Sequence, residues 1–81
     1  MEERRKAGRR RVLKKAKIIF NNRSAVIDCT VRNLSTAGAL LLVPSPLGIP
    51  ETFELLIEAD GTKYQCHVSW RQDDKIGVAF I

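Results

Sequence analysis

Strict alternation of apolar and polar residues along several short segments limits this chain to a narrow class of folds. The clearest segment is "KYQCHVSWR", whose apolar or aromatic set is Tyr64, Cys66, Val68 and Trp70. Successive side chains of a β-strand point to opposite faces, so a period of two predicts a strand with one buried face, and Trp70 falls on that face. Three further segments alternate in the same way: residues 25–34, 52–58 and 75–81.

Turn-forming residues separate these segments. The short pairs are Asn21-Asn22, Asp60-Gly61 and Asp73-Asp74. Prolines and a glycine indicate a longer loop at residues 44–50. The apolar run "ALLLV" at residues 39–43 predicts a strand that is buried on both faces or whose second face binds a partner. Short strands joined by hairpin turns predict an all-β antiparallel barrel or sandwich.

The positive charge of the chain is concentrated at its N-terminus. The 81 residues carry a formal net charge of +5. Residues 1–17 hold nine basic and two acidic side chains, a net +7, whereas residues 18–81 hold five and seven, a net −2. The segment "RRKAGRRR" has little apolar surface to offset chain entropy. We therefore expect residues 1–11 to form a basic arm, disordered or loosely docked until an anionic partner binds, and residues 12–81 to form the barrel.

The composition argues against membrane insertion, metal binding and catalysis. No run approaches the roughly 20 apolar residues of a membrane span, so a cytoplasmic location is expected. Cys29 and Cys66 lie in apolar strand patterns without metal-ligand spacing, which predicts reduced core residues, no metal and no other cofactor. His67 falls on an outward face, and no nucleophile has a recognisable base, so the sequence argues against an enzyme.

A polar segment joins two of the predicted strands in "VRNLSTAGALLL". Asn33 offers an amide donor and acceptor, Ser35 a rotatable hydroxyl, and Gly38 a position that tolerates positive φ or close backbone approach. Such a segment can present these groups to a ligand. By itself it fits an ordinary Asx or serine turn with a glycine bulge equally well.

Two motifs in order along the chain resemble the PilZ domain family. Its members carry Arg-x-x-x-Arg near the N-terminus and Asp/Asn-x-Ser-x-x-Gly further on; here these are "RKAGR" at residues 5–9 and "NLSTAG" at residues 33–38. The closing segment "VSWRQDDKIGVAFI" is similar to the family's final hairpin. The resemblance implies a six-stranded antiparallel Greek-key barrel that binds the bacterial second messenger cyclic di-GMP on its outer surface. Many relatives add a C-terminal helix, whereas the last predicted strand here ends at Ile81; no such helix is expected in these residues, which form either a minimal domain or part of a longer protein.

The resemblance also implies which residues contact the ligand. Arg5 and Arg9 would be the main contacts, since a guanidinium can bind a phosphate, the edge of a guanine or its face. Asn33 and Ser35 would meet a guanine's Watson-Crick or sugar edge, and Gly38 would let the backbone approach. Asn33 occupies a position more often given to Asp, and its amide offers one acceptor where a carboxylate offers two.

Further residues extend the expected site. In relatives an arginine directly before the first motif, here Arg4, tends to accompany binding of an intercalated cyclic di-GMP dimer, so two ligands per domain are expected. Trp70 is a core residue by its phase, with the alternative that it lies at the barrel rim and stacks near a guanine. The remaining basic residues are interpreted as a solvated start of the first strand, with auxiliary phosphate contacts or an interdomain surface as alternatives: Arg10, Arg11, Lys14 and Lys15.

Two other functions are compatible with part of the sequence. A small nucleic-acid-binding barrel would explain the basic arm but not the net acidic body, whose aromatic residues all fit core-facing positions, so nucleic acid is a disfavoured partner. Those aromatic residues are Phe20, Phe53, Tyr64, Trp70 and Phe80. A PilZ-like module that docks to a protein without binding nucleotide is the other hypothesis. For each hypothesis, the process that binding controls depends on an attached domain or downstream partner that the sequence does not identify.

Overall fold

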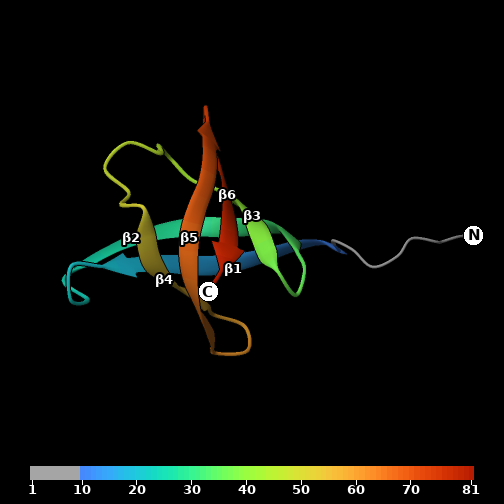
Figure 1. Ribbon diagram of the computed structural model, residues 1–81. Helices are drawn as coiled ribbons and strands as arrows, with labels where there is room; N and C mark the ends of the chain where they lie inside the picture. Colours follow the sequence, from blue (N-terminus) through green and yellow to red (C-terminus); the bar gives the residue numbers. More distant parts are fainter. Residues whose placement is uncertain (1–9) are drawn as a thin grey trace, which may run out of the picture.

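Six antiparallel strands close into a barrel in the computed structural model, which describes residues 10–81 (Figure 1). The strands are β1 (Arg10–Phe20), β2 (Ala25–Leu34), β3 (Gly38–Leu42), β4 (Thr52–Ile57), β5 (Thr62–Gln72) and β6 (Lys75–Phe80). They pair in the order β1-β2-β3-β6-β5-β4, and β4 closes on β1 with Leu55 opposite Ile18. Because β3 pairs with β6, the hairpin-linked strands β4, β5 and β6 complete a Greek key. The predicted six-stranded all-β barrel is confirmed.

Inward-facing side chains from all six strands fill the barrel. The most deeply buried are Ile18, Val31, Leu41, Leu55, Ile57, Cys66 and Ile76. Alternate residues are buried along β3 and β4 and along parts of β2 and β5, as the period of two predicts, whereas Ile76, Gly77 and Val78 of β6 are buried in succession. Among the described residues no polar or charged side chain is buried. The described part of the interior therefore offers no hydrogen-bonding side chain to a polar ligand.

The predicted turns adopt the backbone conformations that their residues favour. Asn21, Asn22 and Asp73 have φ angles of 51–54°, in the left-handed region that Asn and Asp tolerate better than most residues. Gly61 has φ 71° in the turn between β4 and β5. These turns hold β1 against β2, β4 against β5 and β5 against β6.

A β-bulge in β5 overturns the predicted orientation of Trp70. Val68 pairs with Val78 and Trp70 pairs with Gly77, so Ser69 is an extra residue in β5. One inserted residue reverses the alternation beyond it, and Trp70 is 45% exposed. The prediction that Trp70 faces the core is wrong for this reason. The argument that all aromatic residues occupy core positions fails at the same residue.

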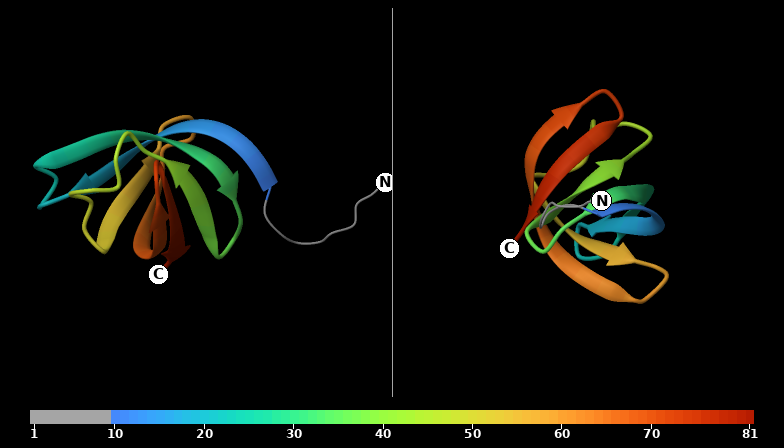
Figure 2. Two further views of the ribbon diagram at one scale, coloured as in Figure 1. Left: turned by 90° about the horizontal axis from the view of Figure 1, so that it is seen from above. Right: turned by 90° about the vertical axis from the view of Figure 1, so that its right-hand side faces the viewer.

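The first strand begins beside the end of the second. Arg10 of β1 pairs with Leu34 of β2, and Arg11 pairs with Asn33, so the backbone of residues 10 and 11 already belongs to the barrel sheet. Figure 2 shows β1 and β2 as a long curved pair that spans the barrel. The rest of the predicted arm, residues 1–9, lies outside the described residues. Residues 10–81 contain no helix that is long and apolar enough to cross a membrane.

The two cysteines are buried free thiols, as predicted. Burial raises the pKa of Cys29 and of Cys66 to about 12 in each case. Both thiols are therefore protonated at neutral pH and act as small apolar side chains of the core.

Candidate functional site

The motif at residues 33–38 forms a tight turn between β2 and β3, which we call the serine turn (residues 35–38). The backbone amide of Ser35 donates to the carbonyl oxygen of Gly38 at 2.9 Å. The amides of Ala37 and Gly38 both donate to Ser35 Oγ at 3.1 Å, and Ser35 Oγ donates to the Gly38 carbonyl oxygen at 3.2 Å. The hydroxyl thus uses its hydrogen and both acceptor positions within the turn. Ser35 holds the turn in shape.

Gly38 is required by the close approach of the serine turn to β6. A Cβ atom added at Gly38 would overlap the carbonyl oxygen of Val78 and lie 3.3 Å from the Cα of Ala79. These are main-chain atoms of the neighbouring strand, so no side-chain rotation relieves the overlap. The amide of Phe80 also donates to the carbonyl oxygen of Ala37 at 2.8 Å. The close packing of Gly38 against β6 therefore explains why the motif has a glycine at this position.

Asn33 lies in β2 between the start of β1 and the start of β3. It pairs with Arg11 on one side and with Leu40 on the other, and the pairing is irregular next to it in both ladders. Its side chain is half-buried. Asn33 is therefore next to the segment that leads from the arginine motif into the barrel.

Chain connectivity limits how far the arginine motif can lie from the serine turn. Arg10 pairs with Leu34, the residue directly before Ser35. Consecutive Cα atoms are about 3.8 Å apart, and an extended chain spans at most about 3.6 Å per residue. The Cα of Arg5, five residues before Arg10, is thus within about 18 Å of it. Arg4, Arg5 and Arg9 lie outside the described residues, so their predicted contacts stay predictions.

A shallow hollow of about 240 Å³ lies between the serine turn and Trp70. Ser35 and Gly38 line one side of it, and Trp70 lines another above Gly77. Trp70 is the only large aromatic side chain that is exposed among the described residues. The structure thus brings three of the predicted site residues together in one hollow. Asn33 does not line this hollow.

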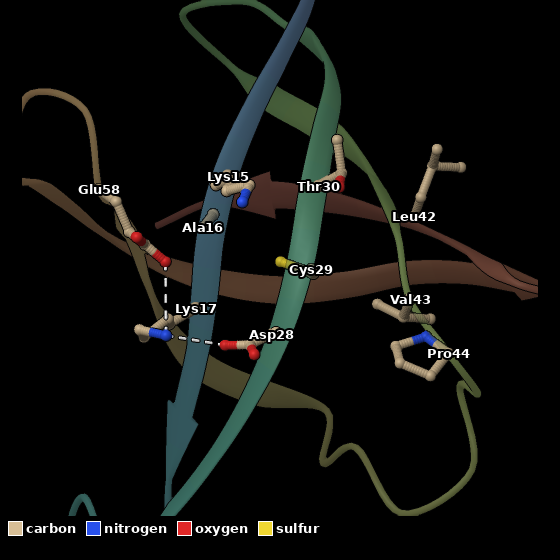
Figure 3. Close-up of a pocket in the computed structure, with 10 residues that line it drawn as sticks. All are labelled: Lys15, Ala16, Lys17, Asp28, Cys29, Thr30, Leu42, Val43, Pro44 and Glu58. Atoms are coloured by element: carbon tan, nitrogen blue, oxygen red, sulfur yellow. Dashed lines mark hydrogen bonds and ion pairs between the residues drawn. The ribbon is translucent and has the colours of Figure 1, made fainter.

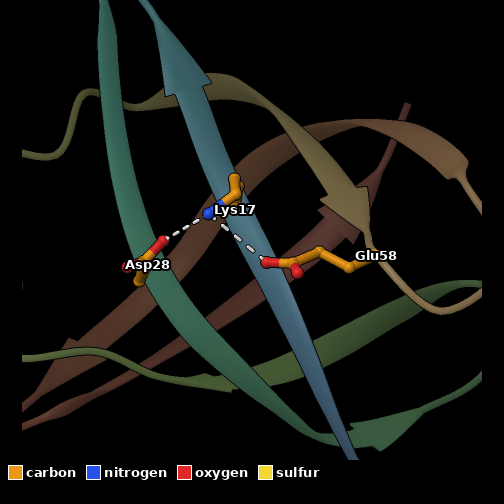
Figure 4. Close-up of polar contacts among 3 residues, drawn as sticks. All are labelled: Lys17, Asp28 and Glu58. Carbon is orange, nitrogen blue, oxygen red and sulfur yellow. Dashed lines mark hydrogen bonds and ion pairs between the residues drawn. The ribbon is translucent and has the colours of Figure 1, made fainter.

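A second hollow, of about 460 Å³, lies over β1 and β2 (Figure 3). Its lining includes four charged residues: Lys15, Lys17, Asp28 and Glu58. Lys17 Nζ lies 2.8 Å from Asp28 Oδ1 and 3.4 Å from Glu58 Oε2, so one ammonium bridges two carboxylates (Figure 4). Hydrogen bonds to Asp28 and Glu58 raise the pKa of Lys17, and the same lysine lowers the pKa of Asp28. Because this lysine is already neutralised by two acidic partners, the second hollow is a poor site for an anionic ligand.

The Lys17–Asp28 pair predicts a pH-dependent contribution to stability. Since the pKa of Asp28 is lower in the folded protein than in the unfolded chain, its contribution is present above about pH 4 and is lost as the pH falls through the folded pKa. Asp28→Asn should lower the melting temperature slightly at neutral pH and leave it unchanged near pH 2. Asp73→Asn, which removes an exposed turn carboxylate, controls for net charge. An equal loss from Asp28→Asn at both pH values would contradict the prediction.

Fold and site together define a class of protein. The chain is a small closed β-barrel with an apolar interior, and its outer surface places the serine turn, an exposed tryptophan and the start of β1 near one another. These are features of a surface-binding module. A family model of the PilZ domain matches residues 3–81, essentially the whole chain, and the chain belongs to the PilZ domain family. No curated protein matches it. PilZ domains are a family of receptor domains of the kind that bind cyclic di-GMP, and the family is not a catalytic one.

Sequence reasoning located the motif but missed two features of the site. It gave Gly77 no role, although that residue lies directly beneath Trp70. It also did not foresee the hydrogen bonds of the Ser35 hydroxyl within the turn, and the predicted contact of Ser35 with the ligand stays a prediction. The Ser-x-x-Gly spacing itself was a usable signal for the turn, because a serine hydroxyl commonly accepts from amides two and three residues later.

Proposed function

We propose that this PilZ domain binds cyclic di-GMP in the hollow between the serine turn and Trp70, with the arginine motif completing the site. The observation that carries the proposal is the pairing of Arg10 with Leu34. It attaches the segment that contains Arg5 and Arg9 next to the serine turn. This attachment supports a site in which the three expected parts, far apart in sequence, act on one ligand.

The chemistry of the ligand suits these parts. Cyclic di-GMP carries two phosphodiester charges and two guanines, and the guanidinium groups of Arg5 and Arg9 can bind either a phosphate or a guanine O6/N7 edge. Each such charge-assisted hydrogen bond contributes on the order of 1.5–3 kcal/mol. The exposed face of Trp70 can stack on a guanine. Asn33 supplies an amide to a base or sugar edge, and Ser35 keeps the turn in the shape that these contacts need.

Binding is proposed to order the N-terminal arm across the barrel. The predicted arm, residues 1–11, carries six basic and two acidic side chains, a net charge of +4, so the two phosphates of the ligand supply the counter-charge that lets the arm pack against the surface. Fixing each backbone residue costs roughly 1–2 kcal/mol, which keeps the net affinity near micromolar and the complex reversible. The ordered arm then gives an attached domain or a partner protein a surface that differs between the free and bound states.

Hydrogen exchange measured by mass spectrometry tests this ordering. Amides of residues 4–9 are expected to exchange fast without ligand and to become protected at saturating cyclic di-GMP, because only then are they held against the barrel; residues 10 and 11 are already paired with β2 without ligand. Amides of β4 and β5 serve as the internal control and should change little. An arm that is already protected without ligand, or still unprotected at saturation, would contradict the proposed switch.

Isothermal titration separates the three candidate functions. Micromolar or tighter binding of cyclic di-GMP, with no binding of GTP or of a single-stranded oligonucleotide, is the expected result. Binding of the oligonucleotide alone would favour a nucleic-acid-binding barrel, for which the exposed Trp70 could stack bases. Absence of binding to all three would favour a protein-docking module.

The same titration measures stoichiometry. Arg4 precedes the arginine motif, and its extra guanidinium can hold a further guanine face or edge of an intercalated dimer. We expect two molecules of cyclic di-GMP per domain at protein concentrations well above the dissociation constant. Arg4→Ala should lower this number towards one. An endpoint of one ligand per wild-type chain would contradict the dimer.

A further inference from the structure

We infer that Gly77 is a positioning residue for Trp70: by having no side chain, it lets the indole lie across β6 and form the stacking wall of the hollow. The inference rests on the proposed function for its consequence in binding. The packing of Trp70 on Gly77 can be tested without ligand. Nothing in the two sequence motifs points to Gly77, which lies in the last strand and outside both of them.

The contact between the two residues is specific. A Cβ atom added at Gly77 would lie closer to the indole than real Cβ atoms come to any neighbour. Its three nearest atoms would be Nε1, Cε2 and Cδ1 of Trp70, which are contiguous in the five-membered ring. All three belong to one side chain, whereas the nearest atoms at Gly38 are main-chain atoms of β6. The space that Gly77 leaves open is therefore occupied by the Trp70 ring.

The bulge at Ser69 and the glycine work together. The extra residue turns Trp70 to the outer face of β5, and the register then sets it opposite Gly77. An exposed tryptophan without this support would have several rotamers of similar energy, and fixing one of them on binding would cost entropy. Gly77 removes the obstacle to one arrangement, in which the five-membered ring lies over Gly77 while the side chain stays partly exposed to a ligand. The hollow is thus shaped before the ligand arrives.

This arrangement selects flat heteroaromatic rings. Stacking on an indole requires a planar π-face and tolerates any base, so Trp70 supplies affinity for a purine ring without reading its edge. Gly77 controls that affinity indirectly, through the position of Trp70. A side chain at position 77 should therefore weaken binding although residue 77 itself need not touch the ligand.

Tryptophan fluorescence of the ligand-free domain is the first test. Trp70 is the only tryptophan of the chain, so emission reports on it alone. Gly77→Ala should displace the indole into solvent, move the emission maximum to longer wavelength and increase quenching by acrylamide. An emission maximum and a quenching constant equal to those of the wild type would overturn the inference.

A double-mutant cycle is the second test and controls for general damage to β6. Trp70→Ala and Gly77→Ala should each weaken cyclic di-GMP binding about tenfold, the loss expected for one stacked base. In the Trp70→Ala background the overlap no longer exists, so Gly77→Ala should change neither the affinity nor the melting temperature further. An equal loss from Gly77→Ala in both backgrounds would show a backbone role and overturn the inference.

Failure of the proposed function gives a different result. If the wild-type domain does not bind cyclic di-GMP, the proposed ligand is wrong. The emission and melting comparisons still decide whether Gly77 positions Trp70, because both are measured on the ligand-free domain. If Gly77→Ala leaves the emission maximum and the quenching constant unchanged while the wild type binds cyclic di-GMP, the inference about Gly77 is wrong and the proposed function stands.

Discussion

Arg9→Ala is expected to weaken the binding of cyclic di-GMP at least about tenfold, and Arg5→Ala to have an effect of the same size. Removing a guanidinium removes charge-assisted hydrogen bonds of roughly 1.5–3 kcal/mol each, and 1.4 kcal/mol corresponds to a factor of ten in affinity. Arg9 immediately precedes the strand that begins opposite Leu34, so its loss affects the part of the arm closest to the serine turn. Isothermal titration of each variant measures the loss.

The matched controls for these variants are the melting temperature and Arg10→Ala. The described buried residues lie between Ala16 and Val78, so neither arginine replacement removes a contact of that core, and the melting temperature of the ligand-free domain should stay within about a degree. Arg10→Ala removes the same charge outside the motif and should weaken binding much less. If Arg10→Ala abolishes binding while Arg5→Ala is harmless, the assigned register of the arginine motif is wrong.

Gly38→Ala is expected to destabilise the domain even without ligand. The added Cβ would overlap the main-chain carbonyl of Val78, so β3 has to move away from β6. Overpacking of this kind costs typically about 1–3 kcal/mol, and a domain of this size loses roughly 4–8 °C of melting temperature per kcal/mol. Thermal unfolding followed by circular dichroism measures the loss. Ligand binding should weaken as well, since the serine turn moves with β3.

Thr36→Ala is the matched control for Gly38→Ala. Thr36 is an exposed residue of the same turn, and its replacement should change the free energy of unfolding by less than about 0.5 kcal/mol. Gly38→Ala could instead leave the melting temperature unchanged and abolish binding of cyclic di-GMP. That result would mean that Gly38 serves the ligand directly, as the family resemblance implies, and that the crowding against β6 is relieved at little cost.

The sequence predicted the fold well wherever the strands pair regularly. In β4, which lies in the alternating segment 52–58, the apolar residues Phe53, Leu55 and Ile57 are all buried, because no bulge interrupts their pairing with β5. Alternation fails as a guide where a bulge inserts a residue. Trp70 lies just beyond such an insertion, and nothing local to "VSWRQ" shows that Ser69 is the extra residue.

The location of the candidate site could be predicted from the sequence, but the roles of its residues could be predicted only in part. The motif at residues 33–38 was recognised from its spacing, and a local turn of four residues needs no other information. The reason for Gly38 lies in β6, some forty residues later in the sequence, and the reason for Gly77 lies in Trp70 of β5. Requirements of this kind arise from contacts between strands. A single sequence does not show them, since it does not state which strands are neighbours.

Closure of the barrel also determines how this domain can associate with other molecules. Each strand of the described chain has two hydrogen-bonded neighbours, so none is an edge strand along its whole length; short stretches such as the start of β1, which pairs with β4 only at residues 16–19, are paired on one side. Six partly apolar strands in an open sheet would be a template for aggregation, and closure removes that hazard. Contacts of the barrel with other molecules are therefore made mainly through the side chains and turns on its outer surface. New binding specificity can then arise by substitution of outward residues while main-chain pairing is preserved.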